Sequence, residues 1–261
     1  MAGIRTPLAV TFSVWKALTL REALSRLFAG RASWFWLLFE PVFHVSYLIF
    51  IYTVIRMRTV GGIDVVIWLI AGMLGFFMFR RTANQASNGV GANRALFAYR
   101  QVKPVDTVLV RGLLEGVLTA AVACILLCAA ALFGHDALPD APLSVFEAFF
   151  GLWLLGMGFG LVMSVVTELL PEVGRIISLV MKPLYVISGV IVPLMSIPQP
   201  YREWLLLNPI AHGLEAARLG FSPYYHAVPE LDIGYLYFCA LVLIVLGLAL
   251  HRRFATRLVT Q

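Results

Sequence analysis

The feature that most constrains this chain is a series of apolar runs, each about as long as a bilayer is thick. A helix that crosses the hydrocarbon core needs about 20 mostly apolar residues. Because 61% of the 261 residues are hydrophobic and only 13% are charged, against about 25% in soluble domains, we expect an integral membrane protein. Six spanning helices are predicted at about 34–55, 63–83, 107–133, 144–169, 174–192 and 233–250.

The basic residues predict the orientation of these spans. Cytoplasmic loops of membrane proteins are enriched in Lys and Arg. With a cytoplasmic N-terminus, 15 of the 20 basic residues fall in cytoplasmic segments, 4 fall outside, and Lys182 lies within the fifth span. The sequence therefore predicts an all-α, multi-pass membrane protein with both termini in the cytoplasm. This topology explains the net charge of +6 better than a nucleic-acid partner does.

Two further segments are predicted to be helical without spanning. In residues 11–30, Leu20 and Leu24 share an apolar arc opposite Glu22 and Arg26, which is typical of an amphipathic helix in the headgroup plane. Residues 193–219 are too interrupted to span, and we expect two short half-helices that dip in from the outer side. The interruptions are Pro193, Pro198, Pro200 and Pro209.

Signatures of catalysis and cofactor binding are missing from the sequence. It has no G-x-x-x-x-G-K-[ST] phosphate loop, so we expect no ATP bound in that manner by this chain. The three cysteines lie inside apolar runs without metal or disulfide spacing. We therefore expect a chain with no catalytic residues, no metal and no cofactor of its own.

A few polar side chains within the spans are consistent with more than one role. Arg111 and Glu115 are four residues apart and are expected to pair on one helix face, while a transport role is the alternative. Glu40 and His44 have the same spacing and could form a proton relay. Lys182 either reaches the cytoplasmic interface or faces a cavity, where it would meet an anionic substrate.

Aromatic residues crowd the first span and recur in the fifth. Such residues often form a belt at the membrane interface, but a row of them along a polar path would also suit stacking against sugar rings. The aromatic candidates for a substrate pathway are Trp34, Trp36, Phe39, Tyr47 and Tyr185.

Residues 93–103 form the most polar interlude of the first half, and we expect a cytoplasmic helix there. On a helical wheel, Tyr99 and Val102 join two alanines on an apolar arc that is expected to pack against the protein. Phe97 falls on the opposite arc, where an exposed aromatic within a polar rim indicates a binding anchor for a partner, or insertion beside lipid headgroups. Its neighbours on that arc are Asn93, Arg94, Arg100 and Gln101.

Two runs carry a family resemblance. N-R-A-L-F-A-Y-R-Q-V-K-P-V-D, residues 93–106, resembles the loop of ABC-2 type permeases in which a coupling helix docks on an ATP-binding subunit. L-N-P-I-A-H-G-L-E-A-A-R, residues 207–218, resembles the outer segment before the last span of that family. The likeness covers nearly the whole chain and is greatest to permeases of bacterial capsular polysaccharide exporters, with O-antigen and teichoic acid permeases as close alternatives.

The resemblance implies a bacterial inner-membrane homodimer with two separate ATPase subunits, which carry the ATP and Mg²⁺ and drive lipid-linked acidic polysaccharide outward. It also implies periplasmic and outer-membrane export partners. Arg21, Arg26 and Arg31 become candidates for meeting an anionic lipid linker, with a solvated or lipid-facing helix as the alternative. The outer half-helices would shape the exit, and their candidate residues are Trp204, Asn208, His212, Glu215 and Arg218.

Two other functions are consistent with the sequence. One is a permease of the same type that exports drugs or small lipids. The other is a proton-coupled transporter or membrane enzyme that uses Glu40 and His44.

Overall fold

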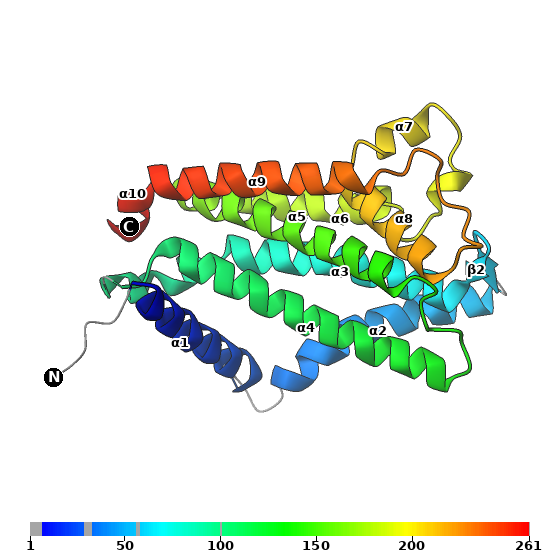
Figure 1. The fold of residues 1–261 in the computed structure, drawn as a ribbon, viewed down its shortest axis with the longest axis horizontal. Helices are drawn as coiled ribbons and strands as arrows, with labels where there is room; N and C mark the ends of the chain where they lie inside the picture. Colours follow the sequence, from blue (N-terminus) through cyan, green and yellow to red (C-terminus); the bar gives the residue numbers. More distant parts are fainter. Residues whose placement is uncertain (1–6, 29–32, 56–57, 100, 261) are drawn as a thin grey trace.

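The computed structural model describes residues 7–28, 33–55, 58–99 and 101–260 as a bundle of helices that run along its long axis (Figure 1). The longer helices are α1 (Pro7–Phe28), α2 (Ser33–Val54), α3 (Val65–Ser87), α4 (Pro104–Leu132), α5 (Pro142–Leu169), α6 (Glu172–Ile187) and α9 (Ile233–Arg253). The short elements are strands β1 (Thr59–Val60) and β2 (Ile63–Asp64), 3-10 helices η1 (Gly91–Ala98) and η2 (Leu194–Ser196), and helices α7 (Tyr201–Leu205), α8 (Pro209–Phe221) and α10 (Ala255–Thr260).

The two ends of the bundle are distinct. One end carries η1 and α10 and is called the η1 end below; the other carries the β1–β2 hairpin and α7 and is called the hairpin end (Figure 1). In the two-stranded hairpin Thr59 pairs with Asp64 and Val60 with Ile63. Asp64 also caps α3, because its side chain accepts the backbone N–H of Val66 at 2.7 Å.

Among the described residues, four helices are long and apolar enough to cross a membrane: α3, α4, α5 and α9. They coincide with the spans predicted at 63–83, 107–133, 144–169 and 233–250. The predictions at 34–55 and 174–192 correspond to α2 and α6. The described apolar stretch of α2 covers only Pro41–Tyr52. At about 1.5 Å per residue, the 16 residues of α6 extend only about 24 Å, so this helix is shorter than the predicted span.

The core lies where α3 and α5 pack together. Every residue of α3 from Val65 to Phe79 is buried, and α5 contacts α3, α4, α8 and α9. The glycines of the G-x-x-x-G pattern in α5 permit this close approach. A Cβ added to Gly156 would lie 2.6 Å from the backbone oxygen of Phe79, and one added to Gly160 would clash with the Cβ of Ala86. The pattern is therefore explained by helix packing.

The broken segment predicted at 193–219 forms η2, α7 and α8, and α8 packs against α3 and α5. Arg218 of α8 is fully buried and holds this segment in place. Its guanidinium donates to the backbone oxygens of Gly189 at 2.9 Å and Val190 at 3.1 Å, just beyond the end of α6. Backbone groups freed where a helix ends inside the protein need such partners, so Arg218 ties α8 to α6.

The charge of Arg218 is balanced by a buried acid and an aromatic ring. Its Nη1 lies 3.1 Å from Glu215 Oε1, and its guanidinium carbon lies 3.9 Å from the centre of the Trp68 ring. The Tyr225 hydroxyl donates to the same oxygen of Glu215 at 2.7 Å. Burial raises the pKa of Tyr225, partly offset by Arg218, so the phenol keeps its proton and remains a donor.

Removal of Arg218 is expected to destabilise the protein strongly. Arg218→Ala would leave Glu215 charged, buried and without its cation, which typically costs about 3–5 kcal/mol. Arg202→Ala is the matched control, because Arg202 pairs at 3.1 Å with the exposed Glu230 and should matter little. The measurement is the melting temperature of the purified protein in detergent. Equal melting temperatures for Arg218→Ala and Arg202→Ala would contradict this account.

Candidate functional site

The carboxylate of Glu115, in α4, joins three helices near the η1 end. Its side chain is only 1% exposed. It accepts hydrogen bonds from Arg26 of α1 and from Nε of Arg81 of α3, the latter at 2.6 Å. Arg26 also reaches Gln85 of α3 at 3.0 Å and Glu22 of its own helix at 3.1 Å. Because each buried charge has an opposite charge beside it, this network holds α1 against α3 and α4.

The predicted pair of Arg111 with Glu115 is wrong. Nε of Arg111 lies 2.9 Å from Glu22 of α1, close enough for an ion pair although its N–H does not point at the oxygen. Nη1 of Arg111 donates to the backbone oxygen of Asn88 at 3.1 Å. Spacing of four residues permits a pair within one helix, but here the partners come from neighbouring helices that the spacing does not reveal.

The basic residues of α1 serve mainly to attach this helix. Arg26 donates to Glu115, and Arg21 donates to the side chain of Asn93 in the η1 segment. Arg31 lies outside the described residues. Leu20 and Leu24 are 58% and 47% exposed, so the apolar side of α1 faces outward and its polar side faces the protein. Arg26 therefore does not stand free to meet a lipid linker.

A cationic cavity of about 330 Å³ opens beside the Glu115 network, between α3, α4 and α6. Arg80, Arg81 and Lys182 supply three positive charges, while Glu115 supplies one negative charge that already serves Arg26 and Arg81. The remaining lining residues are Asn84, Gln85, Ser178 and Met181. With this excess of positive charge and several amide and hydroxyl groups, the cavity is suited to phosphate or carboxylate groups.

Of the residues that line this cavity, sequence reasoning singled out Lys182 and Glu115. In the sequence, Arg80 and Arg81 count only as basic residues that indicate the orientation of the spans. The helical spacing of Arg81, Asn84 and Gln85 could have indicated a polar helix face. The guanidinium of Arg80 lies 5.0 Å from the centre of the Phe77 ring, in the range of a cation–π contact.

His44 of α2 meets α3 and α6 next to this cavity. Its ring centre lies 5.7 Å from that of Phe77 and 6.1 Å from that of Tyr185, both edge to face. The buried hydroxyl of Tyr185 has no hydrogen-bond partner among the described residues. The side chain of Glu40 lies outside those described, so its proposed pairing with His44 stays a prediction.

A row of stacked aromatic rings follows the exposed side of α2. Phe35, Phe39, Phe43 and Tyr47 stack at successive turns, with ring centres 5.0, 5.5 and 6.5 Å apart. Their exposed fractions are 37–58%. This aromatic ladder lies on a different side of α2 from His44, which contacts α3 and α6. The side chains of Trp34 and Trp36 lie outside those described.

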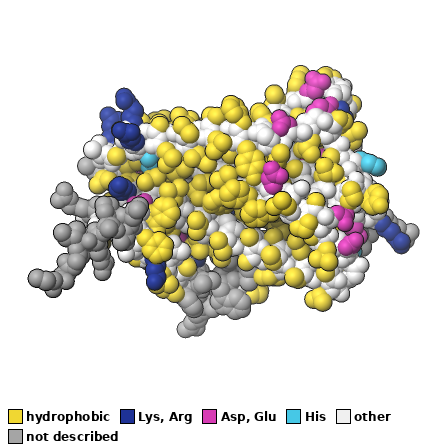
Figure 2. All heavy atoms as spheres, in the orientation of Figure 1, with side chains coloured by type: hydrophobic (Ala, Val, Ile, Leu, Met, Phe, Trp, Pro, Cys, Tyr) yellow, Lys and Arg dark blue, Asp and Glu magenta, His cyan; other side chains and the backbone are white. Residues whose placement is uncertain are grey.

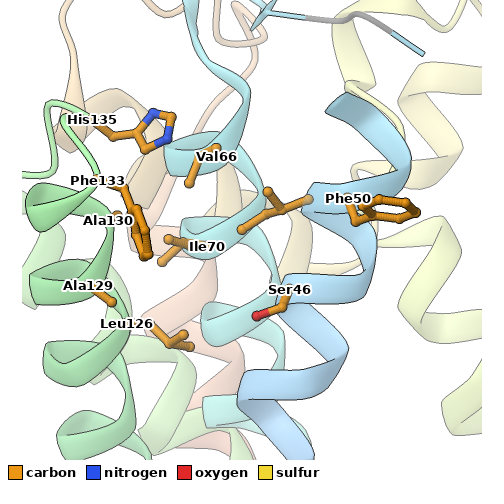
Figure 3. A pocket seen from close by; sticks show the side chains of 10 residues that line it. Ser46, Phe50, Val66, Ile70, Leu126, Ala129, Ala130, Phe133 and His135 are labelled. Atoms are coloured by element: carbon orange, nitrogen blue, oxygen red, sulfur yellow. The ribbon is translucent and has the colours of Figure 1, made fainter. Parts of the chain in front are cut away.

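A second hollow, of about 530 Å³, lies between α2, α3 and α4 near the hairpin end (Figure 3). Its walls are mostly apolar, with Ser46 pointing inward from α2 and Phe133 from the end of α4. His135 stands at its rim, where Nδ1 lies 3.1 Å from Asp64. Among the described residues, no group of three or more His, Cys, Asp or Glu could hold a metal ion.

The polar interlude of the sequence is a 3-10 helix, η1, and its two aromatic residues face the reverse of the expected way. Phe97, predicted to point outward, is only 6% exposed and packs with Val108 and Leu258. Tyr99, predicted to pack inward, is 67% exposed. The expected inner arc carried two alanines, whose small side chains bury less apolar area than one phenylalanine.

The other expected coupling residues lie around Phe97. Asn93 is buried, accepts from Arg21 and donates to the backbone oxygen of Gly89 at 2.8 Å. Arg94 forms an ion pair with Glu168 at the end of α5. Gln101 is exposed, and Arg100 lies outside the described residues. The segment is thus joined to α1 and α5 through its polar side chains.

Most of the expected outer residues are engaged in packing. Asn208 caps α8 through Ile210 N at 3.1 Å and donates to Ser188 at 2.8 Å. His212 is buried; its Nε2 lies 2.8 Å from the Leu206 oxygen, and its Nδ1 accepts the Asp232 N–H at 3.1 Å. Glu215 and Arg218 form the buried pair described above. Of this group Trp204 alone is exposed, at 67%.

Comparison with known proteins relates the chain to one family. Residues 13–222 match the ABC-2 type transporter family. The chain is 35% identical over 237 residues to the polysialic acid transport protein KpsM of Escherichia coli, covering 91% of this chain and 92% of the relative. It is 29% identical to the capsule polysaccharide export inner-membrane proteins CtrC of Neisseria meningitidis and BexB of Haemophilus influenzae. CtrC aligns over 92% of this chain and 90% of its own length, and BexB over 95% and 93%.

Because Phe97 is buried and Tyr99 is exposed, truncating each of them to alanine should have different effects on stability. Phe97→Ala should lower the free energy of unfolding by about 3–5 kcal/mol, because it empties a buried site. Tyr99→Ala, on the exposed side of the same segment, should change it by about 0.5 kcal/mol or less. Thermal melting of the two purified variants measures the difference. If Tyr99→Ala were the more destabilising change, the described packing of η1 would be incorrect.

Proposed function

The chain belongs to the ABC-2 type transporter family, and we propose that it is the membrane subunit of an ATP-driven exporter of capsular polysaccharide. The observation that carries the proposal is the similarity to relatives named for transport of polysialic acid and export of capsule polysaccharide, along about nine-tenths of the chain. The exported substrate is a lipid-linked acidic polysaccharide, which moves outward across the inner membrane. The working unit is a homodimer of this chain with two separate ATPase subunits.

The membrane arrangement in this proposal has six spans, with α2 and α6 added to the four long apolar helices. The η1 end is cytoplasmic, and so are both termini. Charge supports this orientation, because cytoplasmic segments carry the excess of Lys and Arg. On the visible face, most Lys and Arg side chains gather toward the η1 end (Figure 2).

The cationic cavity receives the acidic part of the substrate. It lies near the η1 end, where a substrate made in the cytoplasm arrives, and it combines Arg80 and Lys182 with amide groups. Arg81 and Glu115 line its wall and neutralise each other in part. A carboxylate or phosphate on the substrate would accept hydrogen bonds from Lys182 and from the guanidinium groups that line the cavity.

The aromatic ladder of α2 lines the route of the sugar chain. Its exposed stack from Phe35 to Tyr47 offers flat apolar faces at regular spacing. In a homodimer two such ladders would face each other across the path. Sugar rings can slide along aromatic faces without a fixed set of hydrogen bonds, as a polymer in transit requires.

The ATPase acts on the spans through η1. Movement of this segment reaches α1 through Asn93 and Arg21, α5 through Arg94 and Glu168, and α4 through Phe97 and Val108. Gln101 is exposed just after the segment, and Arg100, which lies outside the described residues, remains a predicted contact. Periplasmic and outer-membrane partners would meet the hairpin end, where Trp204 is exposed.

Neutralising the cavity is expected to reduce export. Lys182→Gln combined with Arg80→Gln removes charge-assisted contacts worth about 1.5–3 kcal/mol each, so polysaccharide at the cell surface should fall about tenfold or more. Arg175→Gln, an exposed cation two turns away on α6, is the matched control. Surface polysaccharide is measured together with the amount of ATPase that co-purifies. Unchanged export by the double variant would refute the role of the cavity.

A further inference from the structure

The side chain of Gln85 is oriented by Arg26, a residue of α1 that does not itself line the cationic cavity. Nη2 of Arg26 lies 3.0 Å from Oε1 of Gln85. Because an arginine side chain has only donors, the atom of Gln85 that faces it must be the amide oxygen. The amide nitrogen, with its two N–H donors, points away from Arg26 and makes no hydrogen bond within the described residues. Since Gln85 lines the cavity, these donors are available to a ligand there.

Glu115 orients Arg81 in a similar way. Its Oε1 accepts a hydrogen bond from Nε of Arg81 at 2.6 Å, while its other oxygen, Oε2, is held by Arg26. A guanidinium group carries five N–H donors in a rigid plane, and Nε supplies only one of them. Arg81 has no other partner among the residues that the structure describes. With Nε turned to Glu115, the edge formed by Nη1 and Nη2 remains for the cavity that Arg81 lines.

Helix attachment explains only part of this arrangement. An ion pair that served only to hold α3 against α4 could bury both of its partners. Instead the side chain of Arg81 is 21% exposed, against 1% for Glu115. Arg81 and Gln85 also lie one helical turn apart on α3, so their donors enter the cavity from the same wall. Such a wall suits an ionised carboxylate or phosphate, whose oxygens only accept hydrogen bonds.

We propose that Glu115 and Arg26 are positioning residues for the recognition of an oxyanion. They fix the guanidinium of Arg81 and the amide of Gln85 so that both donate to one carboxylate or phosphate of the substrate. The inference rests on the proposed function, since it takes the cavity to be the place where the acidic substrate arrives. Through Arg26, α1 forms the back of the substrate site without touching the substrate. Lys182 adds charge from α6 but little direction, because an ammonium group is a point charge on a flexible stem.

Two variants separate positioning from helix attachment and from charge alone. Arg81→Lys keeps the positive charge and an ion pair with Glu115 but loses the planar fork, so oxyanion binding should weaken about tenfold or more. Glu115→Gln removes a negative charge beside a cationic cavity, and charge alone would tighten the binding of an anion. If Glu115 positions Arg81, binding should instead weaken about threefold or more, because one amide oxygen cannot hold two arginines.

The Kd is measured by titration of the purified full chain in detergent at low salt. Two charged probes are used: tetragalacturonate stands for sugar carboxylates and glycerol 3-phosphate for a linker phosphate. The methyl ester of tetragalacturonate has the same sugars without the charge and is the neutral probe. Arg175→Lys, exposed on α6 outside the cavity, is the matched control for the change at Arg81. The melting temperature of each variant is recorded, and if Glu115→Gln does not fold, Arg81→Lys alone decides.

The proposal predicts that both variants bind the charged probes more weakly and that Arg175→Lys binds them as the wild type does. The charged probe that the wild type binds more tightly identifies the source of the oxyanion. Wild-type affinity of Arg81→Lys, or unchanged or tighter binding by Glu115→Gln, would overturn the positioning role but leave the proposed function standing. A wild-type chain that binds neither charged probe more tightly than the methyl ester would overturn both.

Discussion

The carboxylate of Glu115 is the contact on which the η1 end of the molecule depends. It is buried in α4 and shared by Arg26 of α1 and Arg81 of α3, so the loss of Glu115 would break both ion pairs at once. The position of α1 follows from this network. The cavity that Glu115 lines also carries Arg80 and Lys182, so its lining holds more positive than negative charge.

A second buried ion pair fixes the opposite end. Arg218 and Glu215 hold the short helix α8 inside the bundle, against the carbonyl groups that end α6. At the level of the Glu115 network, α3 and α5 approach closely at Gly156 and Gly160. The closely packed centre formed by α3 and α5 can keep its shape while the helices around it move, as an exporter requires. The aromatic ladder of α2 is exposed, and most of α6 is exposed or half-buried. These two helices are therefore the parts of the bundle that can move.

Much of the fold could be predicted from the sequence, because the length of an apolar run is a local property. The spans at 63–83, 107–133, 144–169 and 233–250 are found as long apolar helices. The errors concern partners that come from distant segments. Arg111 has a candidate partner four residues away but binds Glu22, and Phe97 is covered by Leu258, which lies about 160 residues later in the chain. A helical wheel shows which residues share a face but not which face another helix covers.

The most direct test of this account is a double-mutant cycle on Glu115 and Arg26, with Glu115 and Arg81 as a second cycle. The free energy of unfolding is measured in mixed micelles for Glu115→Ala, Arg26→Ala, Arg81→Ala and the two pairs. The account predicts that Glu115→Ala costs about 3–5 kcal/mol, because it breaks both pairs, and that each arginine change costs less, because Glu115 keeps the other arginine. Each pair should cost clearly less than the sum of its members, with a coupling of about 1 kcal/mol or more. Additive costs in both cycles would show that Glu115 does not join α1 to α3, and would contradict the account.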